Sequence, residues 1–376
     1  MGVEIRAEQS AQAAGEQTPF AAGAPRPLRV VERPAPASIP ADATEFLRGL
    51  GGPVAIRVPG RARDRCRTVV TLMHGNEPSG ARAIHGWLRD GLVPTTDTLL
   101  ILASVETALA EPPFTHRQLP GAPDLNRLFG EPGASPGAGP GASPDPSPHG
   151  RLARAVLAAV LAARPEALLD IHNNSGHNPA YGVARRTGTA ERTLCGLFGG
   201  IVVRYDLRLG ALIEVTADGF PSVVIECGRA GDPAADAVAR SGLDRFLGED
   251  DLLQLEPPAQ RVLVDPVRVE ALPGVVLAFG SGPGPGFDLV VDEEIDRHNF
   301  ESMPAGAALG WLRPGAPWPL RAIGAEGRDC SRELFAVEGE RVVARRALIP
   351  IMMTTDPRIA VSDCLFYAVV EEATVA

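Results

Sequence analysis

Lysine is absent from this chain of 376 residues, so arginine carries all 36 of its positively charged side chains. Aspartate and glutamate outnumber them with 46 residues, and the formal net charge is -10 at pH 7. A surface that binds nucleic acid needs clustered basic residues to neutralise phosphates, and the sequence contains no such cluster. The charge pattern therefore excludes nucleic acid as an expected partner.

Long hydrophobic runs are also missing. A helix that spans a bilayer needs roughly 18 apolar residues in succession. The longest candidate, residues 156–163, is shorter than this and is flanked by Arg154 and Arg164. The first residues, MGVEIRAEQS, are charged and polar where a signal peptide has an apolar core. We therefore expect neither a membrane role nor export.

Cysteine is scarce, with five residues in the whole chain. Their number is odd, their spacing is wide, and no C-x-x-C pair occurs, which argues against a disulfide framework. The pattern favours reduced thiols, and we expect a cytoplasmic protein. The five residues are Cys66, Cys195, Cys227, Cys330 and Cys364.

The length of the chain predicts one large and one smaller domain. Residues 1–45 are rich in Ala, Pro and Gln without periodicity, and they predict a loosely ordered N-terminal arm. Residues 46–250 predict an α/β domain. Residues 251–376 contain short β-type runs between Gly and Pro residues, and they predict a smaller, mostly β C-terminal domain.

Strand and helix signals alternate within residues 46–250. The β-branched, apolar run RTVVTLM, which begins at Arg67, predicts a buried strand, and the pattern ARAIHGWLRD after it predicts a helix. The run TLLILAS repeats the strand signal, as in a sheet built from crossover connections. Residues 131–150 hold too many Pro and Gly residues to pack, and they predict a mobile surface insertion.

The motif His74-Gly-Asn-Glu77 stands where a strand is predicted to end and a helix to begin. Two histidines and one glutamate form a common catalytic zinc set, but H-x-x-E alone also occurs often by chance. The sequence DIH closes another apolar strand and brings His172 to the same edge of the sheet. We therefore predict that His74, Glu77 and His172 bind a metal. Asp170 is a candidate to orient one of these ligands as a hydrogen-bond acceptor.

Glu226 directly follows four apolar residues in SVVIECG, so a folded sheet would hold it at a strand end. Burial there raises the pKa of a carboxyl group, and a carboxylate beside a metal-activated water can act as a general base. The alternative interpretation is a surface acid that ends a strand.

Asn126 and Arg127, in the sequence DLNR, offer an amide and a guanidinium side by side. This pair matches a substrate carboxylate, because a guanidinium binds a carboxylate through two parallel hydrogen bonds. The alternative is a solvated loop end. For Asn173, Asn174 and His177, in the polar stretch that follows His172, pocket lining and a purely structural role both stay open.

Together the motifs HGNE, DLNRLF, DIH and IECG resemble those of the succinylglutamate desuccinylase/aspartoacylase family, a branch of the zinc carboxypeptidase-like hydrolases. The resemblance covers residues 69–228. The segments DRHNFESMPAGAALGW and LIPIMM are similar to the β-rich C-terminal domain of that family. The resemblance implies a mixed sheet flanked by helices, with a smaller, mostly β second domain.

The resemblance also implies roles for single residues. His74, Glu77 and His172 match the ligands of one zinc ion, and Glu226 matches the general base. Asn126 and Arg127 match the pair that holds a substrate carboxylate. The implied reaction is hydrolysis of the amide bond of a small N-acyl amino acid.

Two positions depart from the family pattern. Arg117 is the nearest candidate for an arginine that polarises the scissile carbonyl, but it stands farther from Asn126 than the pattern expects. Aspartoacylase-like members carry an arginine before the general base, where this chain has Thr216. A distinct subgroup with its own substrate is therefore expected.

Two other functions remain open at this stage. A zinc carboxypeptidase would use the same chemistry on peptides but needs an open groove. A non-catalytic binding module on the same fold would have no need to keep all four residues of the metal and base set. The oligomeric state, including an assembly of identical chains, is also open.

Overall fold

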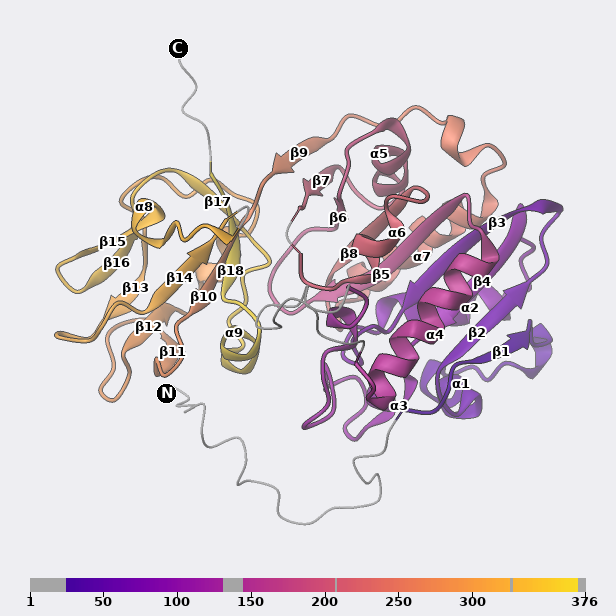
Figure 1. Cartoon of the computed structure of the whole chain (residues 1–376), viewed down its shortest axis with the longest axis horizontal. Coiled ribbons are helices and arrows are strands. Elements are labelled where there is room, and N and C mark those ends of the chain that lie inside the picture. Colours follow the sequence, from indigo (N-terminus) through magenta and orange to yellow (C-terminus); the bar gives the residue numbers. More distant parts are fainter. Residues whose placement is uncertain (1–24, 131–144, 207, 325–326, 371–376) are drawn as a thin grey trace. The chain divides into compact units, whose positions relative to one another are not determined.

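The computed structural model describes residues 25–130, 145–206, 208–324 and 327–370 (Figure 1). These residues divide into two compact units. The N-terminal unit consists of residues 25–173 and 180–262, and the C-terminal unit consists of residues 174–179 and 263–370.

A nine-stranded sheet forms the centre of the N-terminal unit, in the strand order β1-β2-β4-β3-β5-β8-β6-β7-β9. The sheet is mixed: β3 pairs in parallel with both β4 and β5, whereas β2 with β4 and β6 with β8 are antiparallel. The strands are β1 (Arg29–Glu32), β2 (Val54–Val58), β3 (Ala62–Thr71), β4 (Thr96–Leu102), β5 (Ala167–Asn174), β6 (Tyr181–Ala184), β7 (Ile201–Arg204), β8 (Ser222–Arg229) and β9 (Arg261–Val264).

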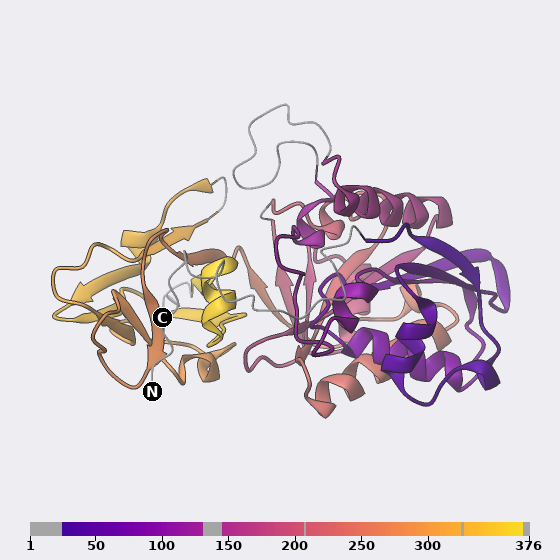
Figure 2. The ribbon, with the colours of Figure 1, turned by 90° about the horizontal axis from the view of Figure 1, so that it is seen from below.

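Helices cover both faces of this sheet, which Figure 2 shows from below. Successive side chains of β3 point to opposite faces of the sheet, and both faces are apolar: Val69 packs into one apolar cluster and Val70 into another. A strand buried on both faces reads as a continuous apolar run, as the sequence does here. The helices are α1 (Ala43–Leu50), α2 (Ser79–Arg89), α3 (Val105–Leu109), α4 (Pro148–Ala163), α5 (Thr189–Gly196), α6 (Leu212–Thr216) and α7 (Pro233–Gly248), with short 3-10 helices η1 (Pro36–Ser38), η2 (Leu125–Arg127) and η3 (Leu252–Gln254).

The two faces have different helices. The larger apolar cluster joins the sheet to α1, α2, α5 and α7, and the smaller one joins it to α4. Leu168 of β5 belongs to the cluster under α4, so Asp170 and His172, at the same parity along the strand, point to that face. The mixed α/β architecture with flanking helices that the sequence predicts is therefore present.

The C-terminal unit contains two sheets with one apolar cluster that includes residues of both. Phe335 and Phe366 link the sheets, with ring centroids 6.1 Å apart in an edge-to-face arrangement. The strands are β10 (Val267–Ala271), β11 (Leu277–Gly280), β12 (Leu289–Asp292), β13 (Ala308–Leu312), β14 (Leu320–Ile323), β15 (Phe335–Glu338), β16 (Arg341–Ala344), β17 (Leu348–Ile351) and β18 (Phe366–Val370), and the helices are η4 (Ile295–His298), α8 (Ser331–Leu334) and α9 (Pro357–Ser362).

The structure differs from the expected loose arm at residues 1–45. Arg29–Glu32 forms β1, which pairs in parallel with β2, and α1 begins at Ala43. Pairing with β2 orders these residues. A strand of only four residues, with prolines close to both of its ends, has no local sequence pattern that predicts this pairing. The rest of the expected arm, residues 1–24, lies outside the described residues.

Two further boundaries also differ. Of the expected insertion at 131–150, residues 131–144 lie outside the described residues, but residues 148–150 open α4. Ser147 explains this start, because its side chain accepts a hydrogen bond from the amide of Gly150 and Pro148 occupies the first helical position. The N-terminal unit continues to residue 262 rather than 250, since Leu252 packs into its core and β9 extends its sheet.

Among the residues that the structure describes, no helix combines the length and the apolarity needed to cross a membrane.

Candidate metal centre and active site

The candidate site lies at one edge of the nine-stranded sheet, where β3 and β5 end side by side. His74 and Glu77 follow β3 in the loop that leads to α2, and His172 is near the end of β5. Because β3 and β5 are parallel, their carboxyl ends meet at the same edge. The loop needs a glycine at position 75, since a Cβ atom there would lie 2.7 Å from the backbone nitrogen of Ala108.

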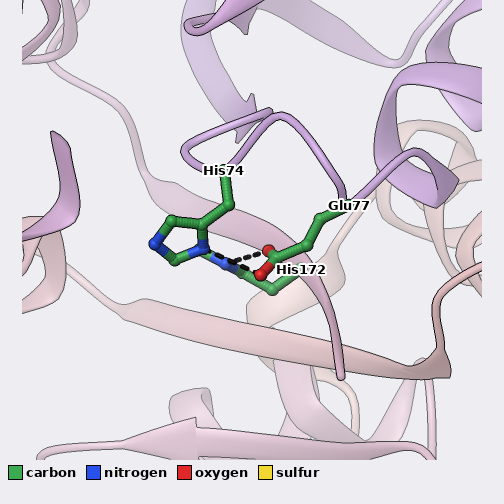
Figure 3. A group of neighbouring side chains, drawn as sticks. All are labelled: His74, Glu77 and His172. Carbon is green, nitrogen blue, oxygen red and sulfur yellow. Dashed lines mark hydrogen bonds and ion pairs between the residues drawn. The ribbon is translucent and has the colours of Figure 1, made fainter. Parts of the chain in front are cut away.

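Three side chains converge at this edge (Figure 3). The Nδ1 atom of His74 lies 2.8 Å from Oε1 of Glu77, and the Nδ1 atom of His172 lies 2.7 Å from Oε2 of the same carboxylate. One ligand atom from each of the three residues falls within 4.8 Å of the others. All three side chains are buried, so their polar atoms face each other rather than solvent.

The outer nitrogen of each imidazole faces a carboxylate. Nε2 of His74 lies 3.0 Å from Oδ1 of Asp124. Nε2 of His172 lies 3.0 Å from Oδ2 of Asp170, at an ion-pair distance without hydrogen-bond alignment. Carboxylates in this position fix the ring and its tautomer in metal-binding histidines. Both rings therefore turn Nδ1 toward the common centre.

Electrostatics favours positive charge at this centre. Burial lowers the pKa of His172, but Asp170 and Glu77 more than offset it and hold that pKa well above its usual range. Burial raises the pKa of Glu77, but the two imidazoles outweigh it and hold that pKa well below its usual range. A divalent cation would supply the charge that this arrangement stabilises. The donor set of two imidazoles and one carboxylate fits zinc.

Glu226 is near the end of β8, the strand next to β5 in the sheet order. Its side chain is buried, and burial raises its pKa to about 8, opposed by His172 and reinforced by Glu77. The charges of His172 and Glu77 contribute to this shift, and β8 is the neighbour of β5, so Glu226 lies near the candidate ligands. A carboxyl group with a pKa near neutrality can both take and give a proton.

Arg117 also reaches the site, despite its distance along the chain from the DLNR motif. Its Nη2 atom donates to Oδ2 of Asp124 over 2.9 Å, and its Nη1 atom lies 3.6 Å from Oε1 of Glu77. The backbone carbonyl of Arg117 accepts a hydrogen bond from the amide of Gly75, which holds the two loops together. Arg117 thus adds a positive charge beside the candidate ligands.

Asn126 and Arg127 lie next to Asp124, in η2. The buried side chain of Asn126 accepts a hydrogen bond from the amide of Leu212 at the start of α6, over 3.0 Å. Its carbonyl oxygen is therefore engaged within the protein. The guanidinium of Arg127 is partly exposed and lies 3.9 Å from Oδ2 of Asp124. Of this pair, Arg127 is better placed to meet an anion.

Sequence reasoning gave Asp124 no role of its own. The structure shows that it contacts His74 and Arg117 at once and has a pKa well below its usual range, because these two residues and Arg127 outweigh burial. Its place beside Asn126 and Arg127 is the signal that could have found it. Of the polar stretch that was left open, Asn173 contacts the site region, whereas His177 pairs with Asp296 inside the C-terminal unit.

Comparison with known proteins identifies a fold. No protein-family model and no curated protein matches the sequence. Solved structures do match. A succinylglutamate desuccinylase/aspartoacylase from Rhodobacter sphaeroides superposes with a TM-score of 0.51 and 14% sequence identity, over 84% of this chain and 87% of the other.

Two further solved structures give similar values. A protein described as a candidate succinylglutamate desuccinylase/aspartoacylase from Shewanella frigidimarina NCIMB 400 has a TM-score of 0.50 and 11% identity, over 84% of this chain and 92% of the other. Murine aminoacylase 3 has a TM-score of 0.48 and 16% identity, over 82% and 96%. The first two structures show that the resemblance to the desuccinylase/aspartoacylase family, which the motifs predict, is present in the fold.

Proposed function

We propose that this chain is a zinc-dependent amidohydrolase of the succinylglutamate desuccinylase/aspartoacylase type, which hydrolyses the amide bond of a small N-acyl amino acid. One observation carries the proposal: His74, Glu77 and His172 present three buried donor atoms to one point. A zinc ion held by these residues would act as a Lewis acid and lower the pKa of a bound water. We propose one such ion per chain.

Glu226 is the proposed general base. Burial raises its pKa toward neutrality, so its carboxylate form can accept the proton of the attacking water and its acid form can then donate that proton to the leaving amine. The products are a carboxylic acid and the free amino group of an amino acid.

The arginines are proposed to bind and orient the substrate. Arg117 carries its charge beside Glu77, where a guanidinium can stabilise negative charge that develops on the scissile carbonyl oxygen. Arg127, with Asn126 beside it, is proposed to bind the carboxylate of the amino acid through a bidentate contact. Asp124 pairs with both guanidinium groups beside the candidate metal ligands, which supports this assignment.

Two alternative functions, a carboxypeptidase and a non-catalytic binding module, are less well supported. The matched structures from Rhodobacter sphaeroides and Shewanella frigidimarina are named as desuccinylases or aspartoacylases, which favours a deacylase over a carboxypeptidase. All four residues of the metal and base set are present and buried, which a non-catalytic binding module would not require. A cytoplasmic location is proposed from the cysteine pattern alone.

The test is a substrate screen. Zinc-loaded protein is incubated with N-acetyl, N-succinyl and other N-acyl amino acids, and the released amino groups are measured. We expect hydrolysis of at least one of them, loss of activity on chelation, and recovery when zinc is added back. If the zinc-loaded protein hydrolyses none of them, or if chelation leaves the activity unchanged, the proposal is wrong.

A further inference from the structure

Asn173 stands directly after His172, and its buried side chain makes three hydrogen bonds. Its Oδ1 atom accepts from the backbone nitrogen of Ser79 over 3.0 Å. Its Nδ2 atom donates to Oγ of Ser79 over 2.9 Å and to the carbonyl of Gly228 over 3.2 Å. Both amide hydrogens are used, so a single rotamer satisfies the side chain.

Ser79 also forms a hydrogen bond to α7. Its hydroxyl donates to Oδ1 of Asp236 over 2.6 Å, and Oδ2 of Asp236 accepts from Arg82 over 2.8 Å. Ser79 is completely buried, whereas Asp236 is partly exposed. We call Ser79, Asn173 and Asp236 the clamp residues.

The clamp residues join the three segments that carry the site. Ser79 is two residues after Glu77, Asn173 is one residue after His172, and Gly228 is two residues after Glu226. None of the clamp residues takes part in the proposed chemistry. Their hydrogen bonds instead set the spacing between the β3–α2 loop and the ends of β5 and β8.

Asn173 also caps the N-terminus of α2. Pro78, which precedes α2, has no side chain that can cap the helix, and the amide of Ser79 is satisfied by Asn173 instead. The next residue, Gly80, packs so tightly that a Cβ atom there would lie 2.2 Å from Oγ1 of Thr71. The start of α2 is therefore seated on β3 and β5, with Asn173 as its capping group.

We propose that Asn173 is a positioning residue for the metal site, a role that rests on the proposed function. Its side chain, held by Ser79 and Asp236, fixes Glu77 relative to His172. Its backbone nitrogen also lies 3.5 Å from Oε2 of Glu77, at the limit of a hydrogen bond. Loss of the amide group would let the β3–α2 loop shift against β5, and the three ligand atoms would no longer meet at their present spacing.

The test measures Co²⁺ binding to metal-free full-length protein, because the visible absorption of Co²⁺ reports the geometry of its ligands. We expect Asn173→Ala to weaken Co²⁺ binding by about tenfold or more and to change the absorption spectrum. Asp236→Ala should weaken binding in the same direction. Asp236→Asn keeps an oxygen that accepts from Ser79, so it should restore binding close to that of the parent.

A matched control comes from the same helix. Asp244→Ala removes an α7 aspartate that pairs with Arg240 away from the clamp residues, and it should leave Co²⁺ binding unchanged. Circular dichroism shows whether each variant is folded. A folded Asn173→Ala variant with the affinity and spectrum of the parent would overturn the inference. If Asn173→Ala does not fold, parent-like binding by Asp236→Ala would overturn it instead.

The two proposals fail in different ways. If the parent protein binds no Co²⁺, the metal site itself is wrong and both proposals fall. If the parent binds Co²⁺ and the clamp variants bind it equally well, the proposed function stands and only the positioning role of Asn173 is lost.

Discussion

At the scale of single residues, Glu226 is the side chain on which turnover depends most directly. Replacing it with glutamine keeps the shape and removes the proton acceptor. We expect Glu226→Gln to hold zinc as the parent does and to lower kcat by at least about a hundredfold. Steady-state kinetics and metal analysis on the same preparation test this. A kcat within about tenfold of the parent, roughly 1.4 kcal/mol, would assign the base role to another group.

The pKa of Glu226 also predicts how stability depends on pH in the metal-free protein. Burial raises this pKa from 4.5 to about 8, so between these values the folded state keeps a proton that the unfolded state releases. The contribution of Glu226 to stability is therefore greatest below pH 4.5 and is lost as pH rises through 8. We expect urea unfolding to show a larger loss of stability from pH 6 to pH 8.5 in the parent than in Glu226→Gln. Equal losses would contradict the shifted pKa.

Asp124 offers a third test at this scale. Asp124→Asn removes the charge that faces Nε2 of His74 and nearly keeps the volume of the side chain. Because such outer carboxylates orient the ring and raise its basicity, we expect zinc affinity to fall about ten- to a hundredfold, measured by competition with a chelator. Asp218→Asn, at an exposed pair with Arg186, is the matched control and should bind zinc as the parent does. An unchanged affinity in Asp124→Asn would remove Asp124 from the metal site.

Some of the site residues could be predicted from local sequence patterns and others could not. His74, Glu77 and His172 could be placed together because each follows a clear strand signal, and strand ends share one edge of the sheet. Arg117 could be named only through the family resemblance, because it lies in a loop whose path follows from contacts with Gly75 and Asp124 rather than from any local pattern. The structure brings these residues together, and their roles in metal binding and catalysis remain proposals.

At the scale of elements, the seating of α2 on the sheet can be tested through Gly80. A methyl group at this position would meet Thr71 and Ile171, so α2 would have to move away from β3 and β5. We expect Gly80→Ala to lower the free energy of unfolding by about 1–3 kcal/mol. Gly49→Ala in α1, where nothing lies within 4 Å, should instead be neutral or stabilise by up to about 1 kcal/mol. Denaturant unfolding of both variants decides, and equal effects would contradict the tight packing.

The elements themselves were predictable where apolar runs were long. Strands β4, β5 and β8 and the second half of β3 are buried on both faces, and their sequences are correspondingly apolar. The edge strand β1 was missed because it has only four residues and is ordered by its pairing with β2. Short edge strands carry little signal of their own, since a partner strand supplies their stability.

At the scale of the whole molecule, one feature had no sequence signal at all. Residues 174–179, which follow the strand of His172, belong to the C-terminal unit rather than to the unit that surrounds them in the chain. Contacts with that unit explain it: Oδ1 of Asn178 accepts from the amide of Met352, and Ser175 bonds to Thr354. Contacts between residues so far apart in sequence cannot be seen in a local pattern.

The whole account rests on one zinc ion held by His74, Glu77 and His172. The most direct measurement is elemental analysis of the purified full-length chain after zinc loading and exhaustive dialysis. We expect about one zinc per chain in the parent, and less than about a tenth of that in the double variant His74→Ala/His172→Ala. A parent that retains no zinc, or a double variant that retains as much as the parent, would contradict the account.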